Sequence, residues 1–249
     1  NTVIVMPETQ SQEKKDALNL IGCKLKLVPA LPYSDPGNYI RQSEIIAKEL
    51  EFKYQKGVLW ANQFDNIANM LGHYKGIGPE IWDQTKGNIN GFTCAVGTGG
   101  TLAGVSKYLK EKNSEVKVFL SDPYGSALYN YFKHNKLESE GNSITEGIGQ
   151  GRITENLKNL KVDGAIRIKD EEALNIIFKM LKEEGLFLGG SSGINICGAM
   201  EMAKKLGPGN NIVTILCDSG QRYQSKIWNK SFLKSKNLPQ PYWMDSKHE

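Results

Sequence analysis

A single stretch decides the fold of this chain, and it reads Phe92-Thr93-Cys94-Ala95-Val96-Gly97-Thr98-Gly99-Gly100-Thr101-Leu102-Ala103-Gly104-Val105. Its apolar start predicts a buried strand, and the residues from Gly100 onward have the spacing of an amphipathic helix. In the turn between them, bare glycine backbone lets N–H groups close on an oxyanion. The two threonine hydroxyls and the helix N-terminus add donors and partial positive charge. The stretch therefore predicts a strand, a phosphate-binding turn and a helix.

Two common nucleotide motifs are excluded by the same residues. The turn lacks the Gly-Lys-Ser/Thr ending of a P-loop, and Leu102 occupies the third glycine position of a GxGxxG dinucleotide motif. Triphosphate and dinucleotide ligands are therefore disfavoured. For this turn considered alone, a tight strand-to-helix connection without a ligand remains the alternative.

On both sides of this stretch, apolar runs of strand length alternate with helical patterns. This alternation is typical of βαβ units and predicts an α/β fold with a largely parallel, buried sheet flanked by helices. The expected strands are 3–6, 24–28, 57–60, 91–96, 116–121, 164–168 and 211–217. The expected helices are 12–21 with Ser11 as N-cap, 38–53, 78–85, 100–112, 170–184 and 193–206. The polar, proline-bearing residues after Phe232 predict a tail on the surface.

The composition is that of an ordinary globular protein. Of the 249 residues, 39% are hydrophobic and 23% are charged, which disfavours a disordered or fibrous chain. The net charge is +4, but basic and acidic residues are interleaved, so we expect no nucleic-acid partner. The longest apolar runs are far shorter than the roughly 20 residues that span a bilayer, and no leader pattern is present, so we expect no membrane association.

The four cysteines lie far apart and form no CxxC pair. No histidine stands at metal-ligand spacing from them, so we expect no metal site. Cys94, Cys197 and Cys217 sit in apolar runs and are expected to be buried free thiols. Free thiols suit a reducing, cytoplasmic location.

Two further glycine clusters resemble the first in composition. Residues 184–195 lead from an apolar run through Gly189-Gly190-Ser191-Ser192-Gly193 into a helix, where the serines act either as N-caps or as ligand contacts. Residues 146–152 form either a flexible loop or bare backbone against which a flat ligand passes. These residues alone leave both alternatives open.

Taken in order along the chain, seven segments carry a family resemblance. They are Met6-Pro7-Glu8-Thr9 with the basic helix and Gly22 that follow, Gln63-Phe64-Asp65-Asn66, Gly78-Pro79-Glu80-Ile81-Trp82 with Thr85, 97–101, 147–149, 191–193 and Ser219-Gly220-Gln221-Arg222-Tyr223. The ordered set resembles the cysteine synthases (O-acetylserine sulfhydrylases), which are pyridoxal 5'-phosphate (PLP) enzymes of fold type II, the tryptophan synthase β-like fold. The resemblance covers nearly the whole chain. The ordered set is far more specific than any one segment.

The resemblance implies a PLP site built from two of the glycine clusters. The residues matched to the cofactor phosphate are Gly97, Thr98, Gly99, Gly100 and Thr101, and Ser191 matches the serine that hydrogen-bonds the pyridine nitrogen. A neutral hydroxyl does not keep that nitrogen protonated, so the cofactor is a weaker electron sink than one paired with a carboxylate. This tuning favours β-elimination over transamination or racemisation.

The resemblance also assigns residues to the substrate. Gln63 matches the glutamine near the substrate carboxylate, and Gly147 matches the glycine at the active-site edge that closes with substrate. In one place the chain departs from the family, because Cys217-Asp218 replaces the usual proline-serine before the Ser-Gly-x-Arg-Tyr segment. The implied reaction is β-replacement of O-acetylserine by sulfide, which gives cysteine and acetate via aminoacrylate.

In the family, the Schiff-base lysine lies in an Asn-Pro…Ser-x-Lys-Asp-Arg stretch before the MPET segment. No such stretch occurs in these 249 residues, so the resemblance implies an N-terminally truncated fold with no catalytic lysine of its own. Residues 1–62 are then the remainder of the smaller N-terminal domain, and residues 63–249 are the larger PLP-phosphate-binding domain with a C-terminal tail. By the same resemblance, we expect this chain alone to be inactive.

Three functional interpretations follow from the resemblance. The first is part of a cytoplasmic, homodimeric cysteine synthase that acts on O-acetylserine and sulfide. The second is a catalytically silent binding module, for instance for the C-terminal tail of serine acetyltransferase, which docks in the cleft of the family's enzymes. The third is a cystathionine β-synthase-like β-replacement enzyme.

Overall fold

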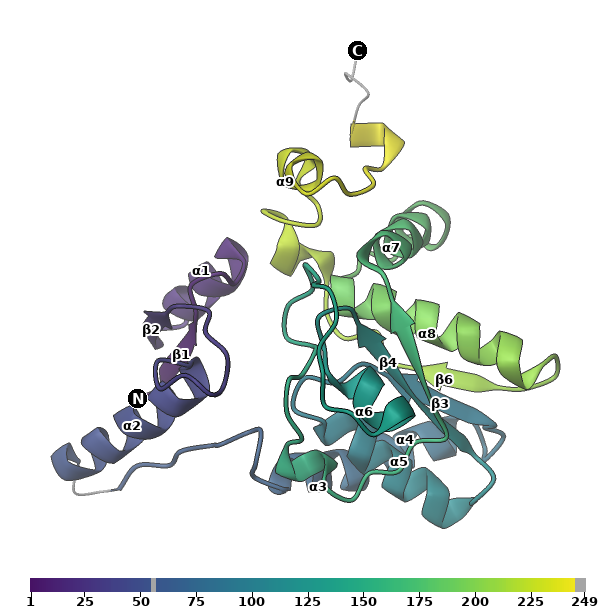
Figure 1. Ribbon diagram of the computed structural model, residues 1–249, viewed down its shortest axis with the longest axis horizontal. Coiled ribbons are helices and arrows are strands. Elements are labelled where there is room, and N and C mark those ends of the chain that lie inside the picture. The colour runs from purple at the N-terminus through teal and green to yellow at the C-terminus, as the bar shows by residue number, and fades with distance from the viewer. Residues whose placement is uncertain (55–56, 245–249) are drawn as a thin grey trace.

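A computed structural model of the chain describes residues 1–54 and 57–244 (Figure 1). The main sheet has four strands, which are β3 (Gly91–Cys94), β4 (Lys117–Pro123), β5 (Gly164–Ile168) and β6 (Ile212–Thr214). They are all parallel, in the spatial order β5–β4–β3–β6. The α/β class and the parallel sheet predicted from the sequence are thus confirmed.

Helices cover both faces of the main sheet, as the continuous apolar runs of its strands require. On one face lies α5 (Gly100–Lys112), packed against α3 (Ala68–Lys75) and α4 (Ile77–Gln84). On the other face lies α8 (Gly190–Leu206), with α7 (Asp170–Glu184) packed on it. Alternate residues of β3 point to the two faces of the sheet. Phe92 is fully buried in the cluster with Leu102 of α5. The Thr93 hydroxyl hydrogen-bonds the Ser121 hydroxyl of β4 (2.7 Å).

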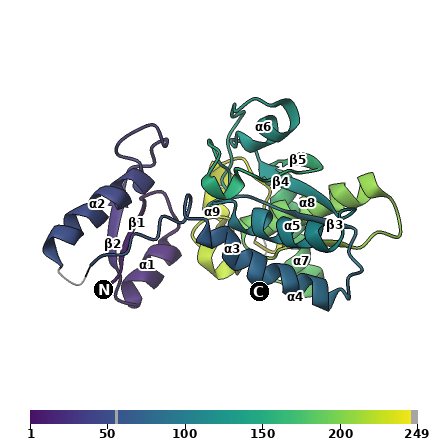
Figure 2. The same cartoon turned by 90° about the horizontal axis from the view of Figure 1, so that it is seen from below.

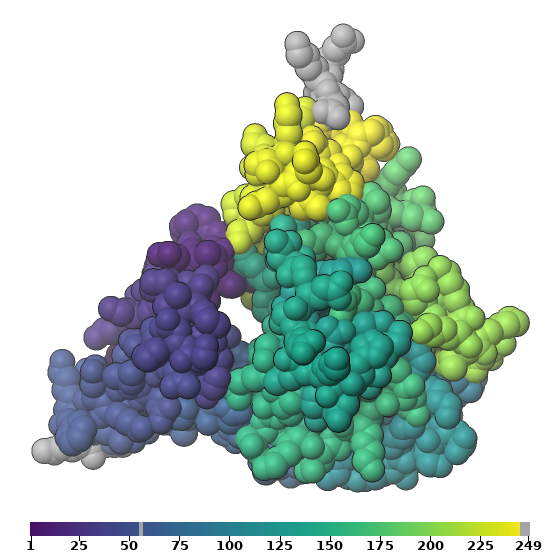
Figure 3. Space-filling model, in the orientation of Figure 1, coloured from purple at the N-terminus to yellow at the C-terminus, as the bar shows by residue number. Residues whose placement is uncertain are grey.

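The first four elements form a separate two-stranded sheet with its helices. They are β1 (Val3–Pro7), α1 (Gln12–Leu20), β2 (Lys24–Val28) and α2 (Tyr39–Lys53), and β1 pairs with β2 in parallel. We call residues 3–53 the N-terminal unit. In Figure 1 this unit, in purple and blue, lies beside the main sheet, and Figure 2 shows the same separation from below. The space-filling view shows a hollow between the N-terminal unit and the rest of the molecule (Figure 3).

Three short helices were not expected from the sequence. They are α3, α6 (Leu128–His134) and α9 (Lys230–Ser235). Each is eight residues long or less, which is shorter than the window over which helical periodicity becomes visible. Single turns of 3₁₀ helix, η1 (Glu155–Leu157), η2 (Gly220–Tyr223) and η3 (Tyr242–Met244), complete the described secondary structure.

The expected strand at 57–60 is wrong. Residues 57–60 form no regular secondary structure, no strand among the described residues pairs with them, and Leu59 is 90% exposed. The expected surface tail is correct only in part: residues 234–237 are exposed, whereas Leu233 of α9 is fully buried in a cluster with Leu174 and Ile177 of α7. The last five residues of that tail, 245–249, lie outside the described residues.

Two further expectations need correction. Ser11 precedes α1 as predicted, but its hydroxyl makes no capping bond and instead donates to the Arg222 carbonyl oxygen (2.6 Å). Cys94 is buried as expected, whereas Cys197 is half-buried and Cys217 is exposed. Cys217 is exposed because β6 ends at Thr214, so the apolar run that contains it continues beyond the sheet.

Candidate active site

The main sheet has a topological switch point between β3 and β6. The chain runs from β3 outward to β4 and β5, then returns to place β6 on the other side of β3. In parallel α/β sheets, ligands bind at the carboxyl ends of the strands where the order reverses. The glycine–threonine turn follows β3, and Cys217 follows β6, so the features singled out in the sequence meet at this crevice.

The turn after β3 is shaped by its glycines. Gly99 has a left-handed backbone (φ 90°) and ends the turn as the N-cap residue of α5. Gly97 is packed so closely that a Cβ there would lie 2.3 Å from the Gly147 carbonyl oxygen. Since neither position accommodates a side chain, the backbone stays bare and an anion can approach the N-terminus of α5.

The threonine hydroxyls of the turn are held by α3. Asn69 Nδ2 donates to the Thr98 hydroxyl oxygen (2.8 Å), which also accepts from the Gly100 N–H (3.3 Å). With both acceptor positions used, the Thr98 hydroxyl still has a proton to donate to an anion. At the end of the 97–101 segment, the Thr101 hydroxyl contacts His73 Nε2 (3.2 Å).

Asn69 and His73 were not placed at the turn by sequence reasoning. They lie four residues apart on the same face of α3, but a helix of eight residues leaves only a weak pattern. Burial lowers the pKa of His73, so its ring is neutral at pH 7. A neutral imidazole supports Thr101 by hydrogen bonding and adds no fixed charge to the crevice.

The second serine cluster starts α8 at the same edge of the sheet. Ser191 is 6% exposed and Ser192 is fully buried, and neither caps the helix. The Ser192 oxygen accepts from the Cys217 N–H (3.0 Å), and the Ser191 hydroxyl hydrogen-bonds the Cys217 thiol. The cap alternative for these serines is therefore wrong, because both face the residues after β6.

Asn195 of α8 links the end of β3 to the residues after β6, including Cys217. Asn195 Nδ2 donates to the Ile215 carbonyl oxygen (2.7 Å) and approaches the Cys217 sulfur (3.4 Å), while its Oδ1 accepts from the Ala95 N–H (2.7 Å). Although Cys217 as a whole residue is exposed, desolvation of its thiol by the surrounding atoms outweighs the hydrogen bonds from Ser191 and Asn195 and raises the pKa of the thiol. The group beside Ser191 is therefore a neutral thiol at pH 7.

The third glycine cluster lies directly against the turn. Gly147 has a left-handed backbone (φ 79°), and the Gly149 N–H donates to the Val96 carbonyl oxygen (2.9 Å). These contacts bring residues 146–152 to the mouth of the crevice. The segment therefore forms a wall of the site beside the 97–101 turn.

Gln63 lies one hydrogen bond away from the turn. Its side chain is exposed, and its backbone carbonyl oxygen accepts hydrogen bonds from the side-chain amides of Asn69 (2.8 Å) and Asn156 (3.0 Å). Asn69 thus bonds both Gln63 and Thr98. The structure brings the sequence-predicted residues Gln63, Gly147 and the 97–101 turn to one place.

An ion pair next to Gln63 joins the same wall to the N-terminal unit. Arg152 makes two hydrogen bonds to Asp65 (2.9 and 2.8 Å), and its guanidinium lies 4.1 Å from the centroid of the Tyr33 ring. The hydrogen bond from Arg152 holds the pKa of Asp65 below its ordinary value. Both groups therefore stay charged at neutral pH.

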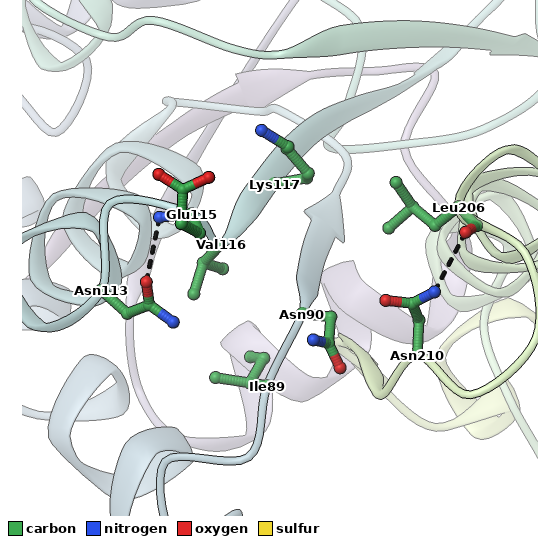
Figure 4. A pocket seen from close by; sticks show the side chains of 8 residues that line it. All are labelled: Ile89, Asn90, Asn113, Glu115, Val116, Lys117, Leu206 and Asn210. Carbon is green, nitrogen blue, oxygen red and sulfur yellow. Dashed lines mark hydrogen bonds between the residues drawn. The ribbon is translucent and has the colours of Figure 1, made fainter.

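A separate cavity of about 140 Å³ lies at the opposite edge of the sheet (Figure 4). Asn90 precedes β3, Lys117 begins β4 and Asn210 precedes β6, so the cavity faces the amino ends of the strands. Its side chains are mixed in polarity, and two of the dashed contacts in Figure 4 are short-range bonds within a turn or helix end. It is not part of the site at the carboxyl edge.

Asp122, at the carboxyl end of β4, carries a buried carboxyl group that none of these contacts uses. It is 0% exposed, and burial raises its pKa to about 7 despite the Ser126 and Tyr129 hydrogen bonds and the charge of Arg167. In the unfolded chain an aspartate ionises near pH 4. Between these values the folded state binds the proton and the unfolded state does not, so stability falls as pH rises through this window.

We predict that Asp122→Asn removes much of this pH dependence. The slope in the free energy of unfolding between pH 5 and 7 should decrease by up to about 1.4 kcal/mol per pH unit. Urea denaturation at pH 5, 6 and 7 measures the slope. The exposed Asp16→Asn serves as the control and should leave it unchanged; equal slopes for wild type and Asp122→Asn would contradict the prediction.

With this geometry established, the chain can be compared with known proteins. Residues 1–218 match the family model described as pyridoxal-phosphate dependent enzyme. The chain belongs to this family. It is 48% identical to cysteine synthase 1 of Neurospora crassa over 241 residues, which cover 95% of the chain and 63% of that protein. It is 47% identical to cysteine synthase 1 of Emericella nidulans, covering 95% and 64%.

The solved structures agree with this family membership. The chain matches the O-acetylserine dependent cystathionine beta-synthase of Helicobacter pylori with a TM-score of 0.79 at 32% identity, covering 90% of the chain and 69% of that structure. Its fold is therefore that of the fold type II PLP enzymes. The chain spans slightly less than two thirds of the length of the two fungal relatives.

The residues of the crevice fit the cofactor of this family. The cradle at 97–101 excludes any Cβ at Gly97 and offers hydroxyl and N–H donors to a phosphate. Ser191 and the Cys217 thiol are both neutral groups, which match a pyridine nitrogen and not a pyridinium. In the bound state, PLP supplies the electron sink for reactions at the amino-acid α- and β-carbons.

Asn69 should influence phosphate affinity although it does not belong to the turn. Asn69→Ala removes the bonds to Thr98 and Gln63, so the Thr98 hydroxyl loses its fixed orientation. We expect PLP affinity to fall about tenfold, the effect of losing one or two oriented hydrogen bonds. Equilibrium dialysis with PLP measures this, with Asn113→Ala as control, and an unchanged dissociation constant would exclude the role.

Proposed function

We propose that this chain forms the PLP-phosphate-binding part of a cysteine synthase, which replaces the acetoxy group of O-acetylserine by sulfide to give cysteine and acetate. The observation that carries the proposal is the pairing of a bare phosphate cradle after β3 with neutral Ser191 after the switch point. The similarity to two fungal cysteine synthases supports it.

The proposed residue roles concern binding and orientation. Gly97, Thr98, Gly99, Gly100 and Thr101 hold the phosphate. Ser191 donates one hydrogen bond to the uncharged ring nitrogen, which favours loss of a β-substituent. Gln63 binds the substrate carboxylate, and Gly147 closes on the substrate from the wall formed by residues 146–152. We assign residues 1–62 to the smaller domain and 63–249 to the larger one.

The proposal is tested by cofactor binding first and by turnover second. The purified protein is mixed with PLP, passed through gel filtration, and assayed for retained cofactor absorbance. Cysteine formation from O-acetylserine and sulfide is then measured with and without PLP. Absence of both retained cofactor and saturable PLP binding would refute the assignment of the cradle.

A serine substitution tests the ring contact. We expect Ser191→Ala to lower cysteine formation by about tenfold or more in a catalytically competent form of the protein, because the ring nitrogen loses its partner. Ser231→Ala on the exposed side of α9 is the matched control. Turnover equal to wild type in Ser191→Ala would contradict its assigned role.

A second candidate is cystathionine formation, which the similarity to the Helicobacter pylori cystathionine beta-synthase favours. It uses the same residues and differs only in the attacking thiol. Homocysteine offered in competition with sulfide distinguishes the two, since the preferred thiol determines the product. A faster reaction with homocysteine would replace the first proposal by the second.

The proposal extends to the assembly of the whole protein. We propose a cytoplasmic homodimer that accepts the C-terminal tail of a serine acetyltransferase in the crevice. No helix among residues 1–54 and 57–244 is long and apolar enough to cross a membrane. Titration of an acetyltransferase C-terminal peptide tests the docking, and sedimentation tests the dimer. A saturable peptide signal without any turnover would favour a binding module.

A further inference from the structure

Glu146 is a buried carboxylate that joins three parts of the chain. Its side chain is 6% exposed, and its Oε2 accepts from Lys14 Nζ (2.8 Å) and from the Ser11 N–H (3.2 Å). Its Oε1 forms an ion pair with Lys226. Lys14 and Ser11 belong to the N-terminal unit, whereas Lys226 follows η2 of the main body.

Neighbouring contacts strengthen the same junction. Glu13 accepts from both the N–H (2.7 Å) and the hydroxyl (2.8 Å) of Ser225, and the Lys14 ammonium lies 4.5 Å from the centroid of the Tyr223 ring. Lys226 also donates to the Thr9 carbonyl oxygen. The α1 helix is thus fixed to the segment 222–226 by contacts that surround the ion pairs of Glu146.

The charges around Glu146 favour the ionised state of its carboxyl group. Burial alone would raise the pKa of Glu146, but the hydrogen bonds and charges of Lys14 and Lys226 outweigh it and lower the pKa. A buried carboxylate with two lysine partners is satisfied, whereas either lysine without it would lose its opposite charge in a largely buried position. The junction therefore depends on the carboxylate more than on either cation.

The position of Glu146 gives this junction a role at the crevice. Glu146 immediately precedes Gly147, whose carbonyl oxygen is packed against Gly97 of the phosphate cradle. Figure 3 shows the hollow beside the N-terminal unit. The α1 helix contacts η2 of the main body, and in Figure 1 α1 lies on the side of the unit away from the linker to α3. A bond at Glu146 therefore sets both the wall of the site and the placement of the unit across from it.

We propose that Glu146 is a positioning residue that, through Lys14 and Lys226, holds the N-terminal unit in place and keeps the 146–151 wall against the phosphate cradle. The inference uses the proposed function only for the identity of the ligand. The mechanical part, the fixing of α1 on the main body, is independent of it.

Hydrogen–deuterium exchange of the ligand-free chain tests the mechanical part. In Glu146→Gln, amide exchange should accelerate about fivefold or more in peptides that cover residues 9–20 and 143–151, and stay unchanged in β3 and β4. Glu201→Gln is the matched control, because Glu201 forms an ion pair with Lys204 on α8 away from the junction (2.5 Å). Unchanged exchange at residues 9–20 would overturn the proposal.

A second variant keeps the test valid if Glu146→Gln does not fold. Lys14→Met should accelerate exchange in the same peptides, and the double variant should add little to Glu146→Gln alone. Effects of the two single changes that simply add would show that Lys14 and Glu146 act independently, which would also overturn the proposal.

The effect on the site is measured by the dissociation rate of PLP after dilution of the loaded chain. We expect PLP to leave about fivefold faster or more from Glu146→Gln and Lys14→Met, and at the wild-type rate from Glu201→Gln. Wild-type rates in all three would refute the positioning role. Failure of the wild-type chain to bind PLP refutes the proposed function instead, and the exchange experiment then decides the inference by itself.

Discussion

Gly97→Ala should abolish tight PLP binding. The new Cβ would lie 2.3 Å from the Gly147 carbonyl oxygen, a distance that no real Cβ contact has, and the clashing atom belongs to the backbone. Either the 97–101 cradle or the 146–151 wall must move, and both form the crevice. We expect the PLP dissociation constant to rise about a hundredfold or more, which corresponds to roughly 3 kcal/mol.

The control for this prediction is Gly72→Ala. Gly72 is exposed on α3, and a Cβ there has no neighbour within 4 Å, so PLP affinity should stay at the wild-type value. Equilibrium dialysis and fluorescence quenching by PLP measure both variants. A Gly97→Ala chain that is folded by circular dichroism and binds PLP like wild type would show that the cradle lies elsewhere.

Gly104→Ala should destabilise the chain although alanine is the better helix former. In the interior of α5, the exchange gains about 1 kcal/mol of helix propensity. A Cβ at Gly104 would however lie 2.3 Å from the Met70 carbonyl oxygen and 2.8 Å from the Tyr74 N–H nitrogen, both in the backbone of α3. Separating two packed helices costs about 1–3 kcal/mol or more, so the clash outweighs the propensity.

We expect the free energy of unfolding of Gly104→Ala to fall by about 2 kcal/mol, as measured by urea denaturation. Because α3 carries Asn69 and His73, PLP affinity should fall with it. Gly72→Ala, in the same helix but without a close neighbour, should instead be stabilised by about 0.5–1 kcal/mol. A Gly104→Ala chain as stable as Gly72→Ala would disprove the close packing of α3 on α5.

Several elements could be predicted from the sequence because their signals are local. The helix at 100–112 and the strands at 24–28 and 164–168 were predicted with the bounds that the structure has. In each case the apolar spacing and the flanking glycine or proline define the element within a window of a few residues. The prediction of a strand at 57–60 is wrong because a strand needs a neighbouring strand to pair with, and this apolar run has none among the described residues.

Some residues of the site could likewise be predicted from the sequence, and others could not. The 97–101 turn and the start of α8 were recognised from glycine and hydroxyl residues, and the structure brings both to the carboxyl edge of the sheet. Asn69 and Glu146 were not assigned any contact in advance. Their partners lie 29 residues away at Thr98 and 132 residues away at Lys14, and contacts at such separations leave no periodic trace in the chain.

By itself, the sequence determined the α/β class and the parallel strands, and it predicted an anion-binding turn after β3, because apolar periodicity and glycine-rich turns can be read from consecutive residues. Only the tertiary structure decided that Cys217 is exposed beside Ser191, that α3 supports the turn, and that Glu146 fixes the N-terminal unit. These features depend on which surfaces meet when distant segments pack. The fold as a whole decides this, and it buries the Glu146 carboxylate where Lys14 and Lys226 from different segments reach it.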